Sequence, residues 1–454
     1  MLWQREDLLK FLEIKSKKFG WVQWALQERE EDRQEFYLIG SPTDRVALDQ
    51  SREVHNKVFR LKVYIGKEGG KQGAAESPLF PKLSLESQLN ELERKAHLGT
   101  EKSWQFPQKW EEGAREPQKV YLPLKEDLAG CAYQIYQDLE KAIKSCGKGE
   151  FNSAELFVIR DKKRQTLSTG FDSQELGSRI YGEVCFSETE KKTGLSEEFL
   201  VTRWVAHPEQ LDFNDMCSES ADSAAASLKT EKPEMGEYHV ILRADVLNTL
   251  FHDVFSQLNA WQKYYQLPFM EKGSELIPGF KGTPFTLKLD PLRDFCFASG
   301  TYSGEGCLQK EMALVERNII QANPTSSQMS QYLDQPTTTV TGSLVLEPEC
   351  VHKASELRRL RPKVLEILQF SGLFSNEMDL TYSSEIRLAR LYDNERGREV
   401  FIKGGNLSGH FPTNFANVVW GGAQVEDNGE SYSSGGTSYV GPEYALVDSV
   451  SVSS

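Results

Sequence analysis

The chain has 454 residues, of which 39% are hydrophobic and 11% aromatic, and its formal net charge is −14. This length and composition predict a globular protein of two or more domains and exclude a disordered or fibrous one. The negative charge argues against nucleic acid or an anionic membrane surface as the main partner, because both require a basic face.

The sequence contains no segment that is typical of export or of membrane insertion. Its longest apolar stretches are interrupted by charges before the roughly 18 residues of a membrane span. Residues 1–18 form a charged amphipathic run without the apolar core of a signal peptide. The seven cysteines are scattered without CxxC or CxC pairs, which is typical of a reducing compartment. We therefore expect a cytoplasmic protein with no nucleic-acid and no membrane partner.

The first 232 residues show patterns of both helices and strands. Helical spacing of apolar residues predicts helices over 2–18, with Gly20 placed to end it, over a stretch from a Ser84 cap to Ala96, and over 128–143 and 211–228. Runs rich in aromatic and β-branched residues predict strands at 21–27, 35–39, 58–65, 155–160, 179–186 and 199–205. The polar stretches 66–84 and 99–117 predict surface loops. We expect an α+β N-terminal domain, residues 1–232, with helices on a sheet.

A domain boundary is expected at Lys232-Pro233, where an Ala/Ser-rich helix has ended. Beyond it the sequence predicts a strand over 238–242, a helix over 244–259, and short β segments from Phe285 to the C-terminus, interrupted by a helix over 353–369. The Ser- and Gly-rich segment 433–441 predicts a surface loop before a last strand over 444–450. The fold class expected for residues 233–454 is a mainly β C-terminal domain with a few helices.

The helix over 244–259 carries His252-Asp253 beside its apolar face, and Gln257 follows five residues after the histidine. A zincin helix needs two histidines one turn apart and a glutamate that activates water. Here no second histidine stands four or five residues after His252. Taken alone, His252-Asp253 is interpreted as an exposed polar pair on an amphipathic helix. The other histidines stand singly, so we expect no metal in this chain.

Two further segments could suggest a nucleophile. Cys307 follows Ser303-Gly304-Glu305-Gly306, and Ser408 lies two residues before His410 in a glycine-rich segment. The first is interpreted as a turn between strands and the second as a glycine-permitted turn that lines a groove. Ser408 does not fit the G-x-S-x-G elbow, because only Leu407 separates it from Asn406.

The order of features across the second half resembles the TldD/PmbA family, described as modulators of DNA gyrase and regarded as a peptidase family. The segments that carry the resemblance are 236–242 leading into the helix over 244–259, then 303–306, 370–373, 383–387, 402–409 and 439–442. The first 150 residues match only loosely.

The resemblance also implies a branch of the family. In the catalytic branch, TldD, this helix carries His-Glu-x-x-x-His, and a cysteine near the C-terminus completes the metal site. Here the three positions are His252, Asp253 and Gln257, and the last cysteine of the chain is Cys350. One remaining ligand cannot hold zinc, and no glutamate is placed to activate its water. The resemblance therefore implies a PmbA/TldE-like member, without cofactor, whose TldD-like partner holds the zinc and with which it encloses a cleft for flexible peptides.

Two functions remain open at this stage. The first is a non-catalytic subunit of a TldD-type metallopeptidase complex that acts on flexible or unfolded peptides. The alternative is a stand-alone metallopeptidase with an atypical site assembled from distant residues such as His252, Glu305 and His410. No catalytic residue is assigned under the first hypothesis, and the sequence does not identify the residues that would contact a peptide.

Overall fold

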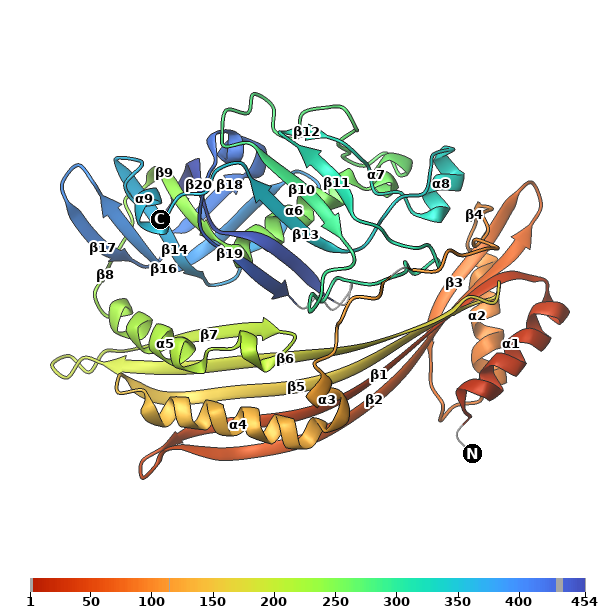
Figure 1. The fold of residues 1–454 in the computed structure, drawn as a ribbon, viewed down its shortest axis with the longest axis horizontal. Coiled ribbons are helices and arrows are strands. Elements are labelled where there is room, and N and C mark those ends of the chain that lie inside the picture. Colours follow the sequence, from red (N-terminus) through yellow and green to blue (C-terminus); the bar gives the residue numbers. More distant parts are fainter. Residues whose placement is uncertain (1–2, 114, 430–435, 454) are drawn as a thin grey trace.

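The structure, a computed structural model, describes residues 3–113, 115–429 and 436–453. Two large β-sheets with helices packed on them form the molecule, and the C-terminal half lies along one side of a long, curved N-terminal sheet (Figure 1). The expected α+β class, with a mainly β C-terminal part, is confirmed. The division into two domains at residue 232 stays a prediction.

The N-terminal sheet contains seven strands in the described residues, in the order β4-β3-β2-β1-β5-β6-β7, and all neighbours are antiparallel. The bounds are β1 Trp21–Ser41, β2 Arg45–Lys67, β3 Lys71–Leu79, β4 Glu101–Lys102, β5 Glu150–Leu167, β6 Asp172–Thr189 and β7 Ser196–Val205. The strands predicted from the sequence lie where they were expected, but they are longer than predicted. The two segments expected at 21–27 and 35–39 are one strand.

Charged residues in the middle of β1 explain this difference. The run from Glu28 to Glu35 has no alternation of apolar and polar residues, so it does not predict a strand. In the sheet its side chains pair with those of neighbouring strands: Glu28 with Lys57 at 2.7 Å and Asp32 with Arg160 at 2.8 Å. Favourable cross-strand pairs thus take the place of apolar contacts in the centre of this sheet.

The polar stretch 66–84 was wrongly interpreted as a loop, because most of it forms β3, which continues the sheet beyond β2. The second expected loop, 99–117, is confirmed as largely irregular, with only β4 as a strand. However, Trp104 in this segment is buried against Phe106 and Tyr64, so the segment is anchored to the sheet.

The helices of this half pack on one face of the N-terminal sheet. Their bounds are α1 Arg5–Phe19, α2 Leu85–Leu98, α3 Leu122–Glu126, α4 Leu128–Ser145 and α5 Phe213–Ser227, with the 3-10 turn η1 Pro208–Gln210. Helices α4 and α5 cover one end of the sheet, while α1 and α2 cover the other. Because side chains alternate along a strand, those on the opposite face of the sheet point towards the C-terminal half.

The C-terminal sheet contains thirteen strands in the described part of the chain and has both parallel and antiparallel neighbours. The strands are β8 Thr230–Glu231, β9 Gly236–Arg243, β10 Phe285–Asp290, β11 Met312–Glu316, β12 Ile319–Ile320, β13 Ser343–Pro348, β14 Lys363–Phe370, β15 Phe374–Asn376, β16 Thr381–Asp393, β17 Arg398–Ile402, β18 Asn406–His410, β19 Val419–Gly429 and β20 Thr437–Ser453. The helices are α6 Ala244–Leu258, α7 Ala260–Tyr264, α8 Ser327–Leu333, α9 Ala354–Leu357 and α10 Phe411–Asn414, followed by the turn η2 Phe415–Asn417.

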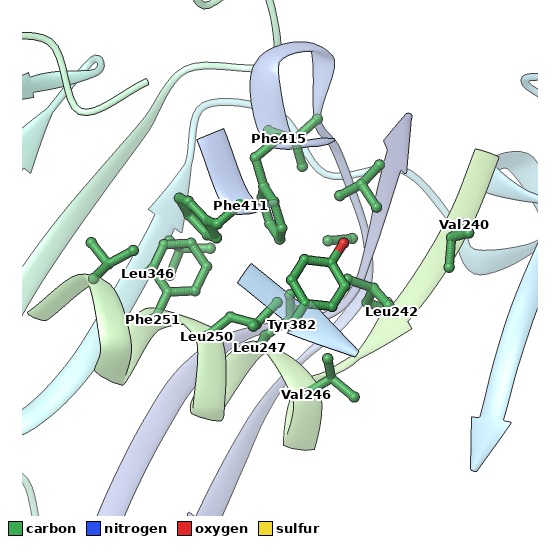
Figure 2. Packing of buried hydrophobic residues seen from close by; sticks show 14 of the residues in the cluster. Val240, Leu242, Val246, Leu247, Leu250, Phe251, Leu346, Tyr382, Phe411 and Phe415 are labelled. Atoms are coloured by element: carbon green, nitrogen blue, oxygen red, sulfur yellow. The ribbon is translucent and has the colours of Figure 1, made fainter. Parts of the chain in front are cut away.

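Helix α6 is the central helix of this half. Its apolar face, which includes Leu247, Leu250 and Phe251, packs into the main core (Figure 2). The ring of Phe251 lies 5.3 Å from that of Phe411 and 6.1 Å from that of Phe415, centroid to centroid. This dense aromatic packing fixes the rotation of α6, and with it the direction of the polar side chains on its other face.

Two expectations for this half were wrong. The helix expected over 353–369 is only the four-residue α9, because 363–370 forms β14 in the interior of the sheet, between β9 and β16. Of the expected loop 433–441, residues 433–435 lie outside the described residues. The rest belongs to β20, where Tyr439 is fully buried. The last strand expected over 444–450 is part of β20.

No helix in residues 3–113, 115–429 and 436–453 combines the length and the hydropathy that a bilayer span requires. All seven cysteines are free thiols.

Candidate functional site

The three motif positions of α6 lie on the side of the helix that faces away from the aromatic core. His252 is half-buried rather than exposed, which corrects the sequence interpretation. Its Nδ1 lies 2.8 Å from the main-chain oxygen of Asn248 and donates a hydrogen bond to it. Burial lowers the pKa of His252, and this hydrogen bond opposes the shift. The ring is therefore neutral at pH 7 and is held by its own helix.

Asp253 and Gln257 face the turn that follows β15. The amide of Gln257, which is 5% exposed, donates to the main-chain oxygens of Glu377 at 2.7 Å and Met378 at 3.1 Å. The hydroxyl of Ser256 donates to the Glu377 carboxylate at 2.5 Å. Burial raises the pKa of Asp253, and the negative charge of Glu377 raises it further. This face of α6 thus fastens the 377–380 turn.

These side chains do not fit a zinc ion. A tetrahedral zinc site takes three or four imidazole, thiolate or carboxylate ligands. Here the amide of Gln257 is committed to two carbonyl groups, and Nδ1 of His252 to a third. Within the described residues, no group of three or more His, Cys, Asp and Glu side chains is arranged to hold a metal ion. The metal content of the protein remains a prediction, to be measured.

A second polar cluster, which no sequence pattern predicts, lies one turn earlier on α6. The side-chain amide of Asn248 donates a hydrogen bond of 2.7 Å to the carboxylate of Asp427, which lies in β19. Burial raises the pKa of Asp427 to about 6; Asn248 opposes the shift and Asp245 adds to it. No charge or spacing pattern connects residues 179 positions apart, so only the fold brings this pair together.

The other candidate residues lie apart from α6 and from one another. Glu305 is half-buried and accepts a hydrogen bond from the main-chain N–H of Gln328 at the start of α8. Burial raises the pKa of Cys307 to about 11, so the thiol is protonated at neutral pH, which suits the turn interpretation. His410 Nδ1 lies 2.8 Å from the Thr413 hydroxyl.

Ser408 lies in strand β18 and not in the predicted turn. It is exposed, and it lines a shallow groove of about 520 Å³ together with His410, as the sequence interpretation expected. His410 forms hydrogen bonds with Thr413 and, through its main-chain N–H, with Asn414, and none in the described residues joins it to Ser408. The structure therefore does not pair this serine with a base.

A larger cavity lies on the face of the N-terminal sheet that looks towards the C-terminal half. We call it the central groove. Its volume is about 580 Å³. Its lining residues are Gln27, Glu28, Arg29, Glu31, Asn56, Val58, Arg60, Glu76, Lys163, Arg164, Gln165, Ser173 and Glu175 of the sheet with Tyr302, Ser303 and Gly304 of the C-terminal half. This volume is within the range of binding pockets, and the groove is polar.

Further along the same sheet face runs a row of half-buried aromatic side chains, one from each of four neighbouring strands. Tyr37 of β1, Phe157 of β5, Tyr181 of β6 and Trp204 of β7 follow one another with ring centroids 5.6, 5.4 and 4.8 Å apart. Trp204 lies 6.3 Å from Phe297 of the C-terminal half. The sequence predicted most of these strand segments, but not that one face would align the rings.

Comparisons with known proteins agree with this architecture. Residues 235–454, which include β9, α6 and most of the C-terminal sheet, match the family model described as the PmbA/TldA metallopeptidase C-terminal domain. No functionally curated protein matched the sequence.

Three solved structures share the fold over nearly the whole chain. A protein described as a proposed modulator of a DNA gyrase from Thermotoga maritima is 15% identical, with a TM-score of 0.74, and 99% of this chain and 100% of that chain are covered. A second protein so described, from Bacteroides thetaiotaomicron, is 13% identical, with a TM-score of 0.74 and full coverage of both chains. TldE from Thermococcus kodakarensis is 12% identical, with a TM-score of 0.75 and 99% coverage of each chain.

At these identities the structural likeness establishes the fold, and the family match identifies the C-terminal half. Residues 235–454 belong to the PmbA/TldA metallopeptidase C-terminal domain family. The resemblance noted in the second half of the sequence is thereby confirmed, and the fold of the whole chain is that of the three solved structures.

Proposed function

We propose that this chain is a non-catalytic, TldE-like subunit of a TldD-type metallopeptidase complex that acts on flexible or unfolded peptides. One observation carries the proposal. At the position where the resemblance implies the second histidine of the catalytic branch, Gln257 donates hydrogen bonds to two main-chain carbonyl groups and fastens the 377–380 turn. Zinc sites use imidazole, thiolate or carboxylate ligands, whereas Gln257 offers a neutral amide whose NH2 group serves the fold.

The proposal divides the work between two chains. The TldD-like partner holds the zinc, which lowers the pKa of a bound water and polarises the peptide carbonyl. This chain contributes surface to the cleft. The central groove, with its neutral amides and hydroxyls, supplies hydrogen-bonding groups, and the aromatic row offers flat apolar area.

An extended peptide can also add to a strand edge. Among the described strands, β7 pairs only with β6, so it has one edge without a strand partner. Main-chain hydrogen bonds to such an edge give affinity with little sequence preference. The free thiols support placing the complex in the cytoplasm.

The test is reconstitution with the partner. This chain is mixed with a TldD-like chain that carries an intact His-Glu-x-x-x-His, and one substrate is offered folded and unfolded. We expect the two chains to co-purify and to cleave only the unfolded substrate, because the backbone of a folded domain is already paired. Equal cleavage of both forms would contradict the proposed preference. Failure of the chains to associate would contradict the subunit assignment.

A further inference from the structure

Lys163 differs from every other charged residue that lines the central groove. The others, in the described part of the chain, each form at least one ion pair. These pairs are Glu28 with Lys57 at 2.7 Å, Arg29 with Glu31 at 3.2 Å, Arg60 with Glu76 at 3.7 Å, Arg164 with Asp172 at 2.5 Å and Glu175 with Lys119 at 3.0 Å. Lys163 forms no hydrogen bond and no close ion pair with a described residue, although its side chain is half-buried; the carboxylate of Asp161, two residues earlier on the same strand, attracts its charge at longer range.

The strand register makes this amine still less favourable. Lys163 of β5 lies directly opposite Arg29 of β1, and like charges in opposite positions destabilise a sheet. On its other side lies Glu175 of β6, but that carboxylate is bound to Lys119. The ammonium group of Lys163 and the guanidinium group of Arg29 thus lie at facing positions in the groove, and the Arg29 side chain is 41% exposed and accessible to a ligand.

Burial lowers the pKa of Lys163, Asp161 opposes this shift, and Lys119, Arg29 and Arg179 add to it. Asp161 also pairs with Arg179 at 3.5 Å, so the ammonium group of Lys163 can accept a further anion from outside the chain. A second cavity of about 20 Å³ adjoins Lys163 and has space for a single water molecule, which can hydrate the amine when no ligand is bound.

We infer that Lys163 and Arg29 form a carboxylate-binding subsite in the central groove, which takes the C-terminal carboxylate or an acidic side chain of a peptide. A carboxylate has two oxygens, one for the Lys163 ammonium and one for the Arg29 N–H. Glu28, Glu31 and Glu175 also line the groove and disfavour a dianion such as phosphate. That the carboxylate belongs to a peptide rests on the proposed function.

The groove is large enough for this ligand. A cavity of about 580 Å³ holds several peptide residues, with Asn56, Gln27 and Ser173 available to the main chain. A free inorganic anion would fill only a small part of it.

The test uses the full chain without its partner and an acetylated Gly/Ala pentapeptide, titrated by calorimetry with a free C-terminal carboxylate or with a C-terminal amide. We expect only the acid form to bind well. Lys163→Gln should weaken its binding about tenfold or more, because a charge-assisted hydrogen bond is lost. Lys163→Arg should restore most of the affinity. Lys162→Gln, on the opposite face of the same strand, is the matched control and should leave it unchanged.

Lys163→Gln should fold, because it breaks no hydrogen bond or close ion pair and leaves Arg179 as the ion-pair partner of Asp161; its melting temperature is measured alongside. Equal binding of acid and amide peptides, equal binding by the parent and Lys163→Gln, or no binding at all would overturn the subsite. Competition by inorganic phosphate as strong as that by the acid peptide would overturn its assignment to carboxylates.

These measurements do not depend on the partner or on cleavage. Lys163-dependent binding by a chain that never associates with a TldD-like partner would leave the subsite standing and refute the proposed function. If the chain associates normally with its partner but binds the peptide without Lys163, the proposed function stands and the subsite is refuted.

Discussion

The side-chain amide of Gln257 donates a hydrogen bond of 2.7 Å to the main-chain oxygen of Glu377, 120 residues further along the chain. Replacing Gln257 by Ala leaves this oxygen and that of Met378 without their donor in a nearly buried site. We expect the free energy of unfolding to fall by about 1–3 kcal/mol. Chemical denaturation measures it.

Two variants give this result a matched comparison. Gln257→Glu keeps the shape but turns an oxygen towards the two carbonyl groups, so it should lose at least as much stability at pH 8 and less at pH 5, where the carboxyl can protonate and donate. Ser256→Ala removes a hydrogen bond at the exposed rim of the same turn and should cost under about 1 kcal/mol. Equal stability of all the variants and the parent would show that the turn is not fastened here.

His252→Ala tests whether the surviving histidine of the motif acts in catalysis. Peptidase activity of the reconstituted complex should stay within a few-fold of the parent, because the imidazole is held by Asn248 and faces no second ligand of the described chain. Loss on the order of 100-fold, the effect of removing a catalytic acid or base, would assign the residue a role in the reaction. The melting temperature of the variant must be measured alongside, since the ring is half-buried.

Asp427 makes stability depend on pH. Its folded pKa of about 6 lies above the ordinary value, so the fold favours the protonated carboxyl, and this stabilisation is lost as the pH rises through 6. From pH 5 to pH 8 the parent should lose about 1 kcal/mol of unfolding free energy more than Asp427→Asn. Unfolding at both pH values measures the difference. Parallel pH profiles for the parent and the variant would contradict the shift.

Gly20 ends α1 in the left-handed conformation, with φ of 68°, and no atom lies within 4 Å of the position that a Cβ would take. Gly20→Ala should therefore cost about 1 kcal/mol from backbone strain alone. Gly147→Ala is the control, because this glycine also has open space but no positive φ, and it should be close to neutral. Thermal unfolding of the two variants compares them. A Gly20→Ala protein as stable as Gly147→Ala would refute the cap.

The sequence predicted most elements whose apolar residues follow one clear period. The helix over 244–259 and the strand before it agree with α6 and β9 within a few residues. The prediction of a helix over 353–369 was wrong because Val364, Leu365 and Ile367 lie in an interior strand that is buried on both faces, where neither alternation nor helical spacing is visible. The strand in the charged middle of β1 was missed for a different reason: the residues that stabilise it are on β2 and β5.

The candidate site was predictable only as a set of positions. The sequence identified His252, Asp253 and Gln257 as a family motif that is incomplete, but it did not show what Gln257 binds. Its carbonyl partners are main-chain atoms of a distant turn, and main-chain atoms leave no sequence signal. Lys163 was not identified either, because its distinguishing property is the lack of a hydrogen bond or close ion pair in the folded sheet.

The central claim is that the catalytic groups lie in the other subunit, and it is tested most directly by assaying zinc and peptidase activity in the same preparations. The samples are this chain alone, the chain with its TldD-like partner, and the chain with a partner whose His-Glu-x-x-x-His glutamate is replaced by glutamine. We predict substoichiometric zinc and no cleavage for the chain alone, cleavage with the intact partner, and none with the altered partner. Stoichiometric zinc together with cleavage by this chain alone would contradict the account.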